Sequence, residues 1–289
     1  MHQLWTIASK GDNIPIVIML VLVAFYTTWG LREARRNEKI IAREGSLPVP
    51  DKVHVWPYLV RIEFLAAIFV MAIFTVWSIF INAPLEEAAN PTRTPNPSKA
   101  PWYFLGLQEM LVYFDPWIAG VVLPSLIIVG LMIIPYIDIN PKGSGYYSFK
   151  ERKFAIVTFL FGFIILWVSL IFVGTFLRGP GWYFFWPWVT WDPHKVVALT
   201  NINLHELFGI RSTLIAFIFG LCVVGGYYSL GPVFYVWKRK TSETLQKMGL
   251  VRYAIVSFLF LTMMALPIKM ILRWTLNIKY VWVTPWFNV

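Results

Sequence analysis

The chain has 289 residues, of which 58% are hydrophobic, 18% are aromatic and only 14% are charged, and its formal net charge is +10. So few charged side chains cannot cover the surface of a water-soluble globule, so the composition excludes an ordinary soluble domain and predicts a membrane-embedded protein. The single cysteine, Cys222, excludes an internal disulfide and a thiolate metal cluster, and the sequence contains no CxxCH motif for a covalently attached c-type haem.

Six apolar stretches, each long enough to cross a bilayer as a helix, follow one another along the chain. They cover residues 14–31, 59–82, 116–137, 154–177, 212–237 and 251–275. The first has only Lys10 as a basic residue before it and no small-residue cleavage site after it, so we interpret it as an uncleaved membrane helix rather than a signal peptide. The predicted fold class is therefore an all-α membrane protein with about six transmembrane helices.

Lysine and arginine collect in the first, third and fifth connections between these stretches. The basic residues are Arg32, Arg35, Arg36, Lys39, Arg43 and Lys52 in the first connection, Lys142, Lys150, Arg152 and Lys153 in the third, and Lys238, Arg239, Lys240, Lys247 and Arg252 in the fifth. The positive-inside rule predicts that these loops are cytoplasmic, so both termini and residues 83–115 and 178–211 face the electrically positive side. Because the cations are dispersed over short loops, they do not predict nucleic-acid binding.

The second connection, from residue 82 to residue 115, is much longer than a hairpin and rich in proline. Its prolines are Pro84, Pro91, Pro95, Pro97 and Pro101. Trp102, Tyr103 and Phe104 follow and lead the chain back toward the bilayer. A long loop with many fixed φ angles suggests a shaped cover over a site, and a rigid linker anchored at the interface by its aromatics is the alternative.

A family resemblance rests on several consecutive motifs in this part of the sequence. They read PDKVHVWPYLVRIEFLAAIFVMAIFTVW, then APLEEAANPTRTPNPSKAPWYFLGLQEML, then IPYIDINPKG. In this order they resemble the C-terminal half of cytochrome b, which is a separate protein, subunit IV, in b6f-type complexes. Residues 100–103, Ala-Pro-Trp-Tyr, stand where the family loop ends in Pro-Glu-Trp-Tyr, and Asn90-Pro91 and Gln108 also match the family pattern. The resemblance covers about residues 50–177.

The resemblance implies the quinol-oxidation pocket of a cytochrome bc complex, with the 83–115 loop on the positive side, as the charge count also predicts. In this family the pocket passes one electron from quinol to a Rieske iron–sulfur protein and the other to a low-potential b haem, and it releases protons outward. A quinone ring needs apolar walls and a few hydrogen-bonding groups. The predicted quinol-binding residues are Pro101, Trp102, Tyr103, Phe104 and Leu105.

One position departs from the family pattern. The family glutamate thought to accept a quinol proton corresponds to Pro101, and proline cannot take a proton. Glu109 is the first candidate for this catalytic role, because a carboxylate within an apolar run near the membrane surface is costly. If residues 102–111 form a helix, Trp102, Leu105 and Glu109 share one face. The competing carboxylates are Glu86, Glu87 and Asp115, and a merely solvated or paired Glu109 is the structural alternative.

The four histidines do not predict a haem site. His2, His54, His194 and His205 fall near the ends of the apolar stretches or in loops, whereas the family ligates its b haems in the N-terminal half that this chain lacks. The chain is therefore expected to hold no redox cofactor of its own. The resemblance implies three partners: a haem-binding cytochrome b N-terminal-half subunit, a Rieske protein with a 2Fe-2S cluster, and a c-type cytochrome. It also implies a dimeric complex in the lipid bilayer.

The chain divides by sequence character into four regions. They are an N-terminal helix with a basic loop (1–49), the cytochrome b-like region (50–177), an aromatic interfacial segment (178–211) and two further helices with a tail (212–289). The interfacial segment either docks a partner such as a c-type cytochrome or lies against lipid, and residues 203–211 predict a short helix. The helices beyond the three of subunit IV indicate an enlarged bacterial form in the cytoplasmic membrane, with both termini periplasmic.

Two other functions compete with the quinol-oxidising one. A transporter would need ionisable residues along several spans, and apart from Arg61, Glu63 and Lys269 near span ends the spans carry almost none. A haem-free quinone-reactive or structural anchor subunit of another respiratory oxidoreductase is the nearer alternative. The proline-rich loop with Trp102 and Tyr103 favours the bc complex over such an anchor.

Overall fold

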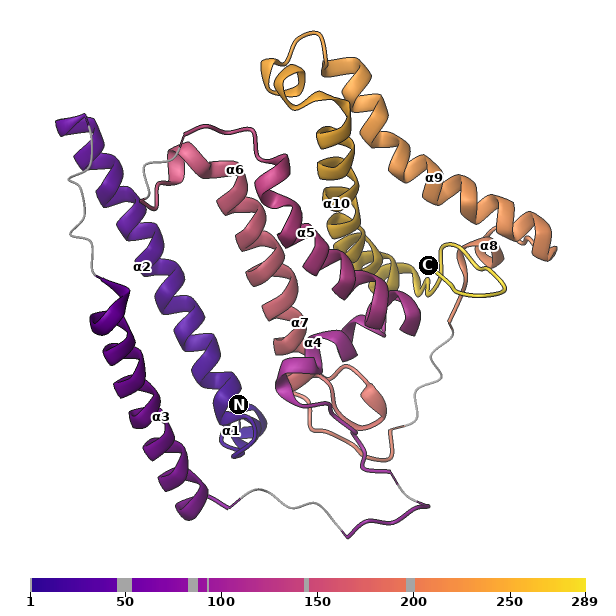
Figure 1. Cartoon of the computed structure of the whole chain (residues 1–289). Coiled ribbons are helices and arrows are strands. Elements are labelled where there is room, and N and C mark those ends of the chain that lie inside the picture. The colour runs from indigo at the N-terminus through magenta and orange to yellow at the C-terminus, as the bar shows by residue number, and fades with distance from the viewer. Residues whose placement is uncertain (1, 46–53, 83–87, 93, 143–145, 196–200) are drawn as a thin grey trace. The chain divides into compact units, whose positions relative to one another are not determined.

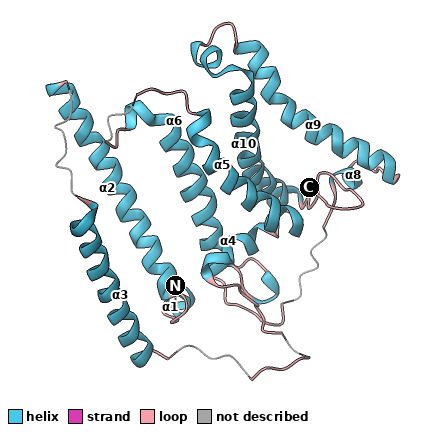
Figure 2. Cartoon of the chain, in the orientation of Figure 1, coloured by secondary structure: helices cyan, strands magenta, loops and turns pink. Residues whose placement is uncertain are grey.

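The computed structural model describes residues 2–45, 54–82, 88–92, 94–142, 146–195 and 201–289. Within these residues the regular secondary structure is helical, and β-structure is confined to isolated bridges (Figure 2). Six of the described helices are long and apolar enough to cross a membrane. The predicted all-α, six-span fold class is confirmed, and the chain is a multi-pass membrane protein.

The six spans lie close to the predicted apolar stretches (Figure 1). They are α2 (Ile14–Glu44); η1 (Val55–Leu59) with α3 (Val60–Phe80); η2 (Ile118–Val122) with α5 (Leu123–Ile137); the run of α6 (Phe149–Leu160), η3 (Phe161–Val168), α7 (Ser169–Phe172) and η4 (Val173–Leu177); α9 (Thr213–Lys238); and α10 (Glu243–Leu276). The shorter helices are α1 (His2–Ala8), α4 (Trp102–Met110), η5 (Pro180–Trp182) and α8 (Leu204–Leu207).

The largest difference from the sequence prediction is the length of α2. The predicted span ends at residue 31, but the helix continues to Glu44, so much of the expected basic loop is helical. The added segment, REARRNEKIIARE, is rich in arginine, glutamate and alanine, which are strong helix formers in water. Gly45 ends the helix with φ 75°, and its N–H donates to the Ile41 carbonyl. The short α8 confirms the helix expected within residues 203–211.

By internal contacts the chain forms two compact units. The first contains residues 1–96, 142–156 and 186–190, and the second contains residues 97–141, 157–185 and 191–289. The four regions assigned from sequence describe composition rather than packing, and they stay predictions.

In the first unit α2 packs against the segment before α6. Asn37 Nδ2 donates to the Tyr147 carbonyl at 3.0 Å, and the Lys150 backbone N–H donates to Glu38 Oε1 at 2.6 Å. Ala34 is fully buried on this same side of α2. In contrast, α3 buries none of its residues. An apolar helix exposed all round must be covered by lipid or by other subunits.

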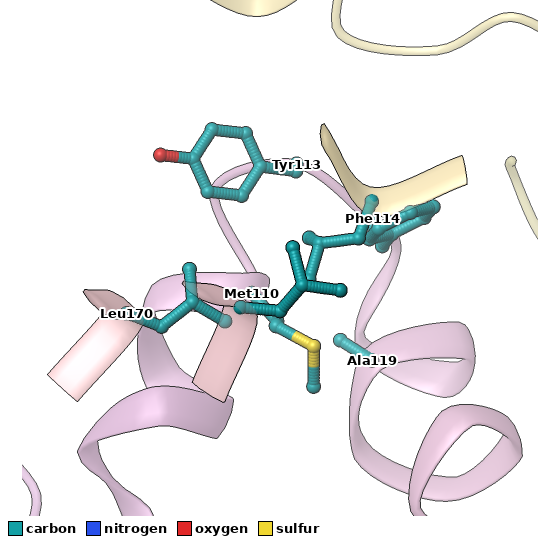
Figure 3. Packing of buried hydrophobic residues seen from close by; sticks show 7 residues of the cluster. Met110, Tyr113, Phe114, Ala119 and Leu170 are labelled. Carbon is teal, nitrogen blue, oxygen red and sulfur yellow. The ribbon is translucent and has the colours of Figure 1, made fainter. Parts of the chain in front are cut away.

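The core of the second unit lies where α4, η2, α7 and α10 meet. Its buried residues are Met110, Tyr113, Phe114, Ala119, Leu166, Leu170 and Leu266. Figure 3 shows Met110, Phe114 and Ala119, close in sequence, gathered with Leu170 of α7. Because Met110 is the last residue of α4, this core holds the C-terminal end of that short helix in place.

Candidate functional site

The helix considered as a condition for residues 102–111 is present as α4, which covers Trp102–Met110. Pro101 precedes it with ψ 149°, which is extended, and its carbonyl accepts from the Phe104 N–H at 2.9 Å as the first turn forms. Proline suits a helix start because its missing N–H has no helical partner there. Pro116 follows shortly after the helix, and the restriction it places on Asp115 disfavours further helix before it.

Gln108 fixes the end of the loop onto α4. Its Oε1 accepts from the Ala100 backbone N–H at 2.7 Å, and its Nε2 donates to the Ser98 carbonyl at 2.9 Å. The Gln108 amide thus binds one backbone donor and one backbone acceptor of the same loop segment. These bonds replace the hydrogen bonds that water would otherwise make to the loop. The direction from which the chain enters Pro101 and α4 is therefore set by this one side chain.

Lys99 ties the same loop to the end of the fourth span. Its Nζ donates to the Thr175 carbonyl in η4 at 2.7 Å, and it lies 5.0 Å from the centre of the Trp191 ring. A carbonyl at a helix end and an aromatic face both attract an ammonium group. Gln108 and Lys99 together hold residues 98–101 in a defined position beside α4.

The two faces of α4 differ in exposure. Leu105 and Glu109 are buried and Trp102 is half-buried, so the face predicted to carry these three residues points into the protein. Tyr103 and Phe104 point outward, and each is 53% exposed. The ring centres of Tyr103 and Phe104 are 4.9 Å apart, and those of Trp102 and Tyr103 are 5.7 Å apart. Three adjacent aromatic rings thus form an apolar surface at the start of α4.

Leu105 is not part of that open surface. Its side chain is 2% exposed and packs against Gly174 of η4, where an added Cβ would lie 2.9 Å from Leu105 Cγ. The absence of a side chain at Gly174 lets α4 approach the fourth span closely. Leu105 therefore anchors the helix, and a direct contact with a ligand would require α4 to move.

Glu109 is completely buried and forms an ion pair with Arg178. Arg178 Nη2 donates to Glu109 Oε1 at 2.6 Å and Arg178 Nε donates to Oε2 at 3.0 Å, which is a two-pronged guanidinium–carboxylate arrangement. Arg178 is 7% exposed. A buried charge without a partner is strongly destabilising. Each of these two charges is therefore tolerated in the protein interior because the other compensates it.

Tyr113 completes the environment of the carboxylate. Its hydroxyl donates to Glu109 Oε1 at 2.9 Å, and its ring packs edge-on against Trp274 of α10. Burial and the neighbouring Glu109 charge raise the pKa of Tyr113 above its ordinary value of 10.0. The phenol therefore keeps its proton at neutral pH and remains a hydrogen-bond donor to Glu109.

Arg178 belongs to a tight loop that sequence reasoning did not single out as part of the site. Its Nη1 donates to the Trp182 carbonyl at 3.1 Å, and Gly181 and Trp182 adopt positive φ angles of 67° and 59°. The Phe185 N–H donates to the Leu177 carbonyl at 2.8 Å and closes the loop. The available signal was an arginine at the end of a long apolar span, on the same predicted side as Glu109.

The other candidate carboxylates are placed differently. Asp115 is half-buried, and its Oδ1 accepts from the Trp117 backbone N–H at 3.0 Å at the start of the third span. Glu86 and Glu87 lie outside the described residues. Of the two candidate carboxylates that the structure describes, Glu109 is buried and Asp115 is partly exposed to solvent.

Among the described residues, no group of three or more His, Cys, Asp or Glu side chains is arranged to hold a metal ion. His54, His194 and His205 lie outside the six long helices, and the side chain of His2 is not described. Ligation of a b haem requires histidines that face one another inside a helix bundle. The three described histidines do not form such a pair.

Comparisons with known proteins confirm the resemblance for the part of the chain that contains α4. Residues 88–175 match the family model described as cytochrome b(C-terminal)/b6/petD. The chain is 28% identical over 133 residues to a cytochrome b of Allochromatium vinosum, covering 42% of this chain and 32% of that protein. It is 31% identical over 99 residues to the "menaquinol:cytochrome c reductase cytochrome c subunit" of Geobacillus thermodenitrificans, covering 32% of this chain and 40% of that protein. The chain thus spans about a third to two fifths of the length of these relatives. No solved structure matches it significantly.

Proposed function

We propose that this chain is a membrane subunit of a cytochrome bc complex and forms part of its quinol-oxidation site. The observation that carries the proposal is the aromatic surface formed by the exposed rings of Tyr103 and Phe104 beside the half-buried Trp102. It lies on a short helix within the segment that matches the cytochrome b C-terminal family. The bound quinol would be oxidised there, and the chain would support electron transfer to a c-type cytochrome with proton release on the positive side.

The aromatic surface suits a quinone head group. A flat apolar ring with two polar oxygens packs well against aromatic faces, and the Tyr103 hydroxyl adds a hydrogen-bond donor next to them. These rings lie at the N-terminal end of a helix held at three points: by Gln108, by Lys99 and by the Arg178–Glu109 pair. A wall that is already rigid loses little conformational entropy when a ligand binds.

The redox groups would come from partner subunits. A haem-binding cytochrome b N-terminal-half protein would take one electron, and a Rieske protein with a 2Fe-2S cluster would take the other and pass it to a c-type cytochrome. The printed name of the Geobacillus relative, "menaquinol:cytochrome c reductase cytochrome c subunit", supports a c-type cytochrome as the acceptor in this proposal. The family resemblance also supports a dimeric complex in the cytoplasmic membrane of a bacterium.

The proton acceptor is proposed from two described carboxylates. Glu109, predicted first, is enclosed and paired with Arg178, so a proton taken there has no direct path to water. Asp115 is half-buried and could exchange a proton with the surface. The geometry therefore favours Asp115 for proton transfer and a positioning role for Glu109, and the predicted proton-accepting role of Glu109 stays open to test.

Copurification tests the proposal. An affinity-tagged chain should be expressed in its own host, extracted in a mild detergent and analysed for subunits, for reduced-minus-oxidised haem spectra and for quinol-driven reduction of cytochrome c. We expect b haem, a Rieske protein and c-type haem to copurify with activity, and the chain expressed without partners to carry no stoichiometric b haem. Copurification with a molybdenum or multihaem enzyme instead would make the chain an anchor of another oxidoreductase.

A matched pair of variants links the activity to the proposed site. Trp102→Ala removes part of the aromatic surface and should weaken quinol or inhibitor binding by about 1–3 kcal/mol, the scale of one buried apolar side chain. Trp286→Ala removes an equally large ring that is 83% exposed in the C-terminal tail and should leave binding unchanged. Equal effects of the two substitutions would argue against a ligand at Trp102.

A further inference from the structure

The cytoplasmic-side extension of α2 carries its positive charge on one face. Five cations and Ile40 line a surface groove along this helix, and all five cations are exposed. The cations are Arg32, Arg35, Arg36, Lys39 and Arg43, and we call them the α2 basic stripe. At about 3.6 residues per turn, they fall within an arc of roughly 100° around the helix.

The opposite face of the same helix is the one that packs against the rest of the first unit. Gly30 lies against Tyr147, Ala34 is fully buried, and Asn37 donates to the Tyr147 carbonyl. At about 100° per residue these positions centre on the side of the helix diametrically opposite the basic stripe. The stripe therefore faces away from the contacts that α2 makes within its own unit.

The stripe begins where the bilayer should end. Phe25, Tyr26 and Trp29 lie just before it, each more than half exposed, and the Tyr26 and Trp29 rings stack with centres 6.0 Å apart. Exposed aromatic clusters of this kind mark the boundary between hydrocarbon and head groups. From residue 14 to residue 31 the helix is about 27 Å long, close to the thickness of the hydrocarbon core.

The spacing puts the first cations at the level of lipid phosphates. Arg32, Arg35 and Arg36 fall within about 8 Å of the end of the apolar segment along the helix axis, and the polar head-group layer is about 5–8 Å deep. Lys39 lies about 12 Å beyond the apolar segment, within about a Debye length of the head groups, where the surface potential of anionic lipid still acts, whereas Arg43, at about 18 Å, lies at the weak outer edge of that potential. Four of the five cations are arginine, whose planar guanidinium binds phosphate with two parallel hydrogen bonds.

Pairing within the helix leaves this charge available. Arg36 Nη1 lies 3.7 Å from Glu33 Oε2, and the two side chains are 72% and 42% exposed. An exposed ion pair of this length contributes little and exchanges easily with another anion. We propose that the α2 basic stripe is a binding site for the phosphate head groups of anionic phospholipids in the leaflet on the basic-loop side. This inference does not depend on the proposed quinol chemistry.

The test compares lipid binding by the full chain in mild detergent after removal of native lipid. The probes are acyl-labelled phosphatidylglycerol and phosphatidylcholine, titrated at low and high salt. The quadruple variant Arg32→Gln, Arg35→Gln, Arg36→Gln, Lys39→Gln removes four of the five charges of the stripe without touching the packing face of the helix. The matched control, Lys238→Gln, Arg239→Gln, Lys240→Gln, Lys247→Gln, removes the same charge from the fifth connection.

We expect the parent and the control to bind phosphatidylglycerol at least tenfold more tightly than phosphatidylcholine, and the quadruple variant to lose this preference. Each cation near the surface contributes about fivefold, so single Lys39→Gln should already give a measurable loss if the larger variant unfolds. The preference should fall as salt rises. Free inorganic phosphate at the same concentration should not displace the lipid, because it lacks acyl chains that hold it at the interface.

Four outcomes would overturn the inference. They are an unchanged lipid preference in the quadruple variant, an equal loss in the control, full displacement by inorganic phosphate, and a parent chain without lipid preference whose stripe crosslinks to an acidic subunit in the purified complex. The last would assign the stripe to a protein interface.

Discussion

The guanidinium of Arg178 donates hydrogen bonds to both carboxylate oxygens of Glu109, and the two residues are 69 positions apart in the chain. One belongs to the short helix that presents the aromatic surface, and the other follows directly after the fourth span. Both are buried. This single contact therefore connects the candidate site to the loop at residues 178–185, which the sequence suggested only as an interfacial segment.

A double-mutant cycle measures this connection. Glu109→Gln and Arg178→Gln should each destabilise the chain by about 3–5 kcal/mol, because each leaves an unpaired buried charge. The double variant should be destabilised by about 1–3 kcal/mol less than the sum of the two. Chemical unfolding in detergent provides the free energies, and Asp115→Asn serves as a control on the same segment. Strict additivity would show that the two side chains do not interact in the folded protein.

The close approach at Gly174 gives a second prediction. Gly174→Ala places a Cβ 2.9 Å from Leu105 Cγ, so α4 or its neighbours must shift. We expect destabilisation by about 1–3 kcal/mol, the usual scale of overpacking. Gly120→Ala is the control, because a Cβ there meets no atom within 4 Å. If Gly174→Ala is as stable as Gly120→Ala, α4 is not held against the fourth span in the way described.

A third prediction separates proton transfer from positioning. In the purified complex, Asp115→Asn should lower turnover while stability and assembly stay normal. Glu109→Gln should lower stability and turnover together, and Arg178→Gln should do the same although it keeps the carboxylate. A Glu109→Gln complex that is as stable as the parent but turns over about ten- to a thousandfold more slowly would identify Glu109 as the proton acceptor.

Topology provides a fourth prediction. In a Cys222→Ser background, a cysteine at the exposed position Ser98 should react with a membrane-impermeant thiol reagent added from outside intact cells. A cysteine at Ser144, which lies outside the described residues, should react only after the membrane is opened. The opposite pattern would place α4 on the cytoplasmic side, where quinol oxidation could not release protons outward.

Hydropathy was sufficient to predict the six spans but not all of their ends, and it did not predict the short helix α1. Apolar runs locate six spans because each must bury a bilayer-length stretch, whereas α4 was considered from the sequence only as a condition under which Trp102, Leu105 and Glu109 share one face. The extension of α2 beyond residue 31 was missed because its residues are charged, and hydropathy reports insertion rather than helix formation. Helix propensity of the same residues was the signal that favoured a longer helix.

The surroundings of Glu109 could be predicted only in part, because local sequence does not show which distant residues pack against it. Local sequence placed Glu109 on one face with Trp102 and Leu105 if the segment is helical, but the burial of that face and the identity of its partner depend on contacts with residues far along the chain. Arg178, Tyr113 and Lys99 reach the site only through the packing of α4 on the fourth span. Leu105 was predicted as a ligand contact from its neighbours in sequence, whereas packing against Gly174 encloses it.

Photolabelling with a quinone tests the central claim most directly. A photoreactive azidoquinone would be bound to the purified complex, activated by light and located by mass spectrometry of the digested chain. The account predicts labelling at Trp102, Tyr103 or Phe104 that excess unlabelled quinol abolishes, and weaker labelling in Trp102→Ala but not in Trp286→Ala. Competable labelling found only elsewhere in the complex, with residues 101–105 unmodified, would contradict a quinol site on α4.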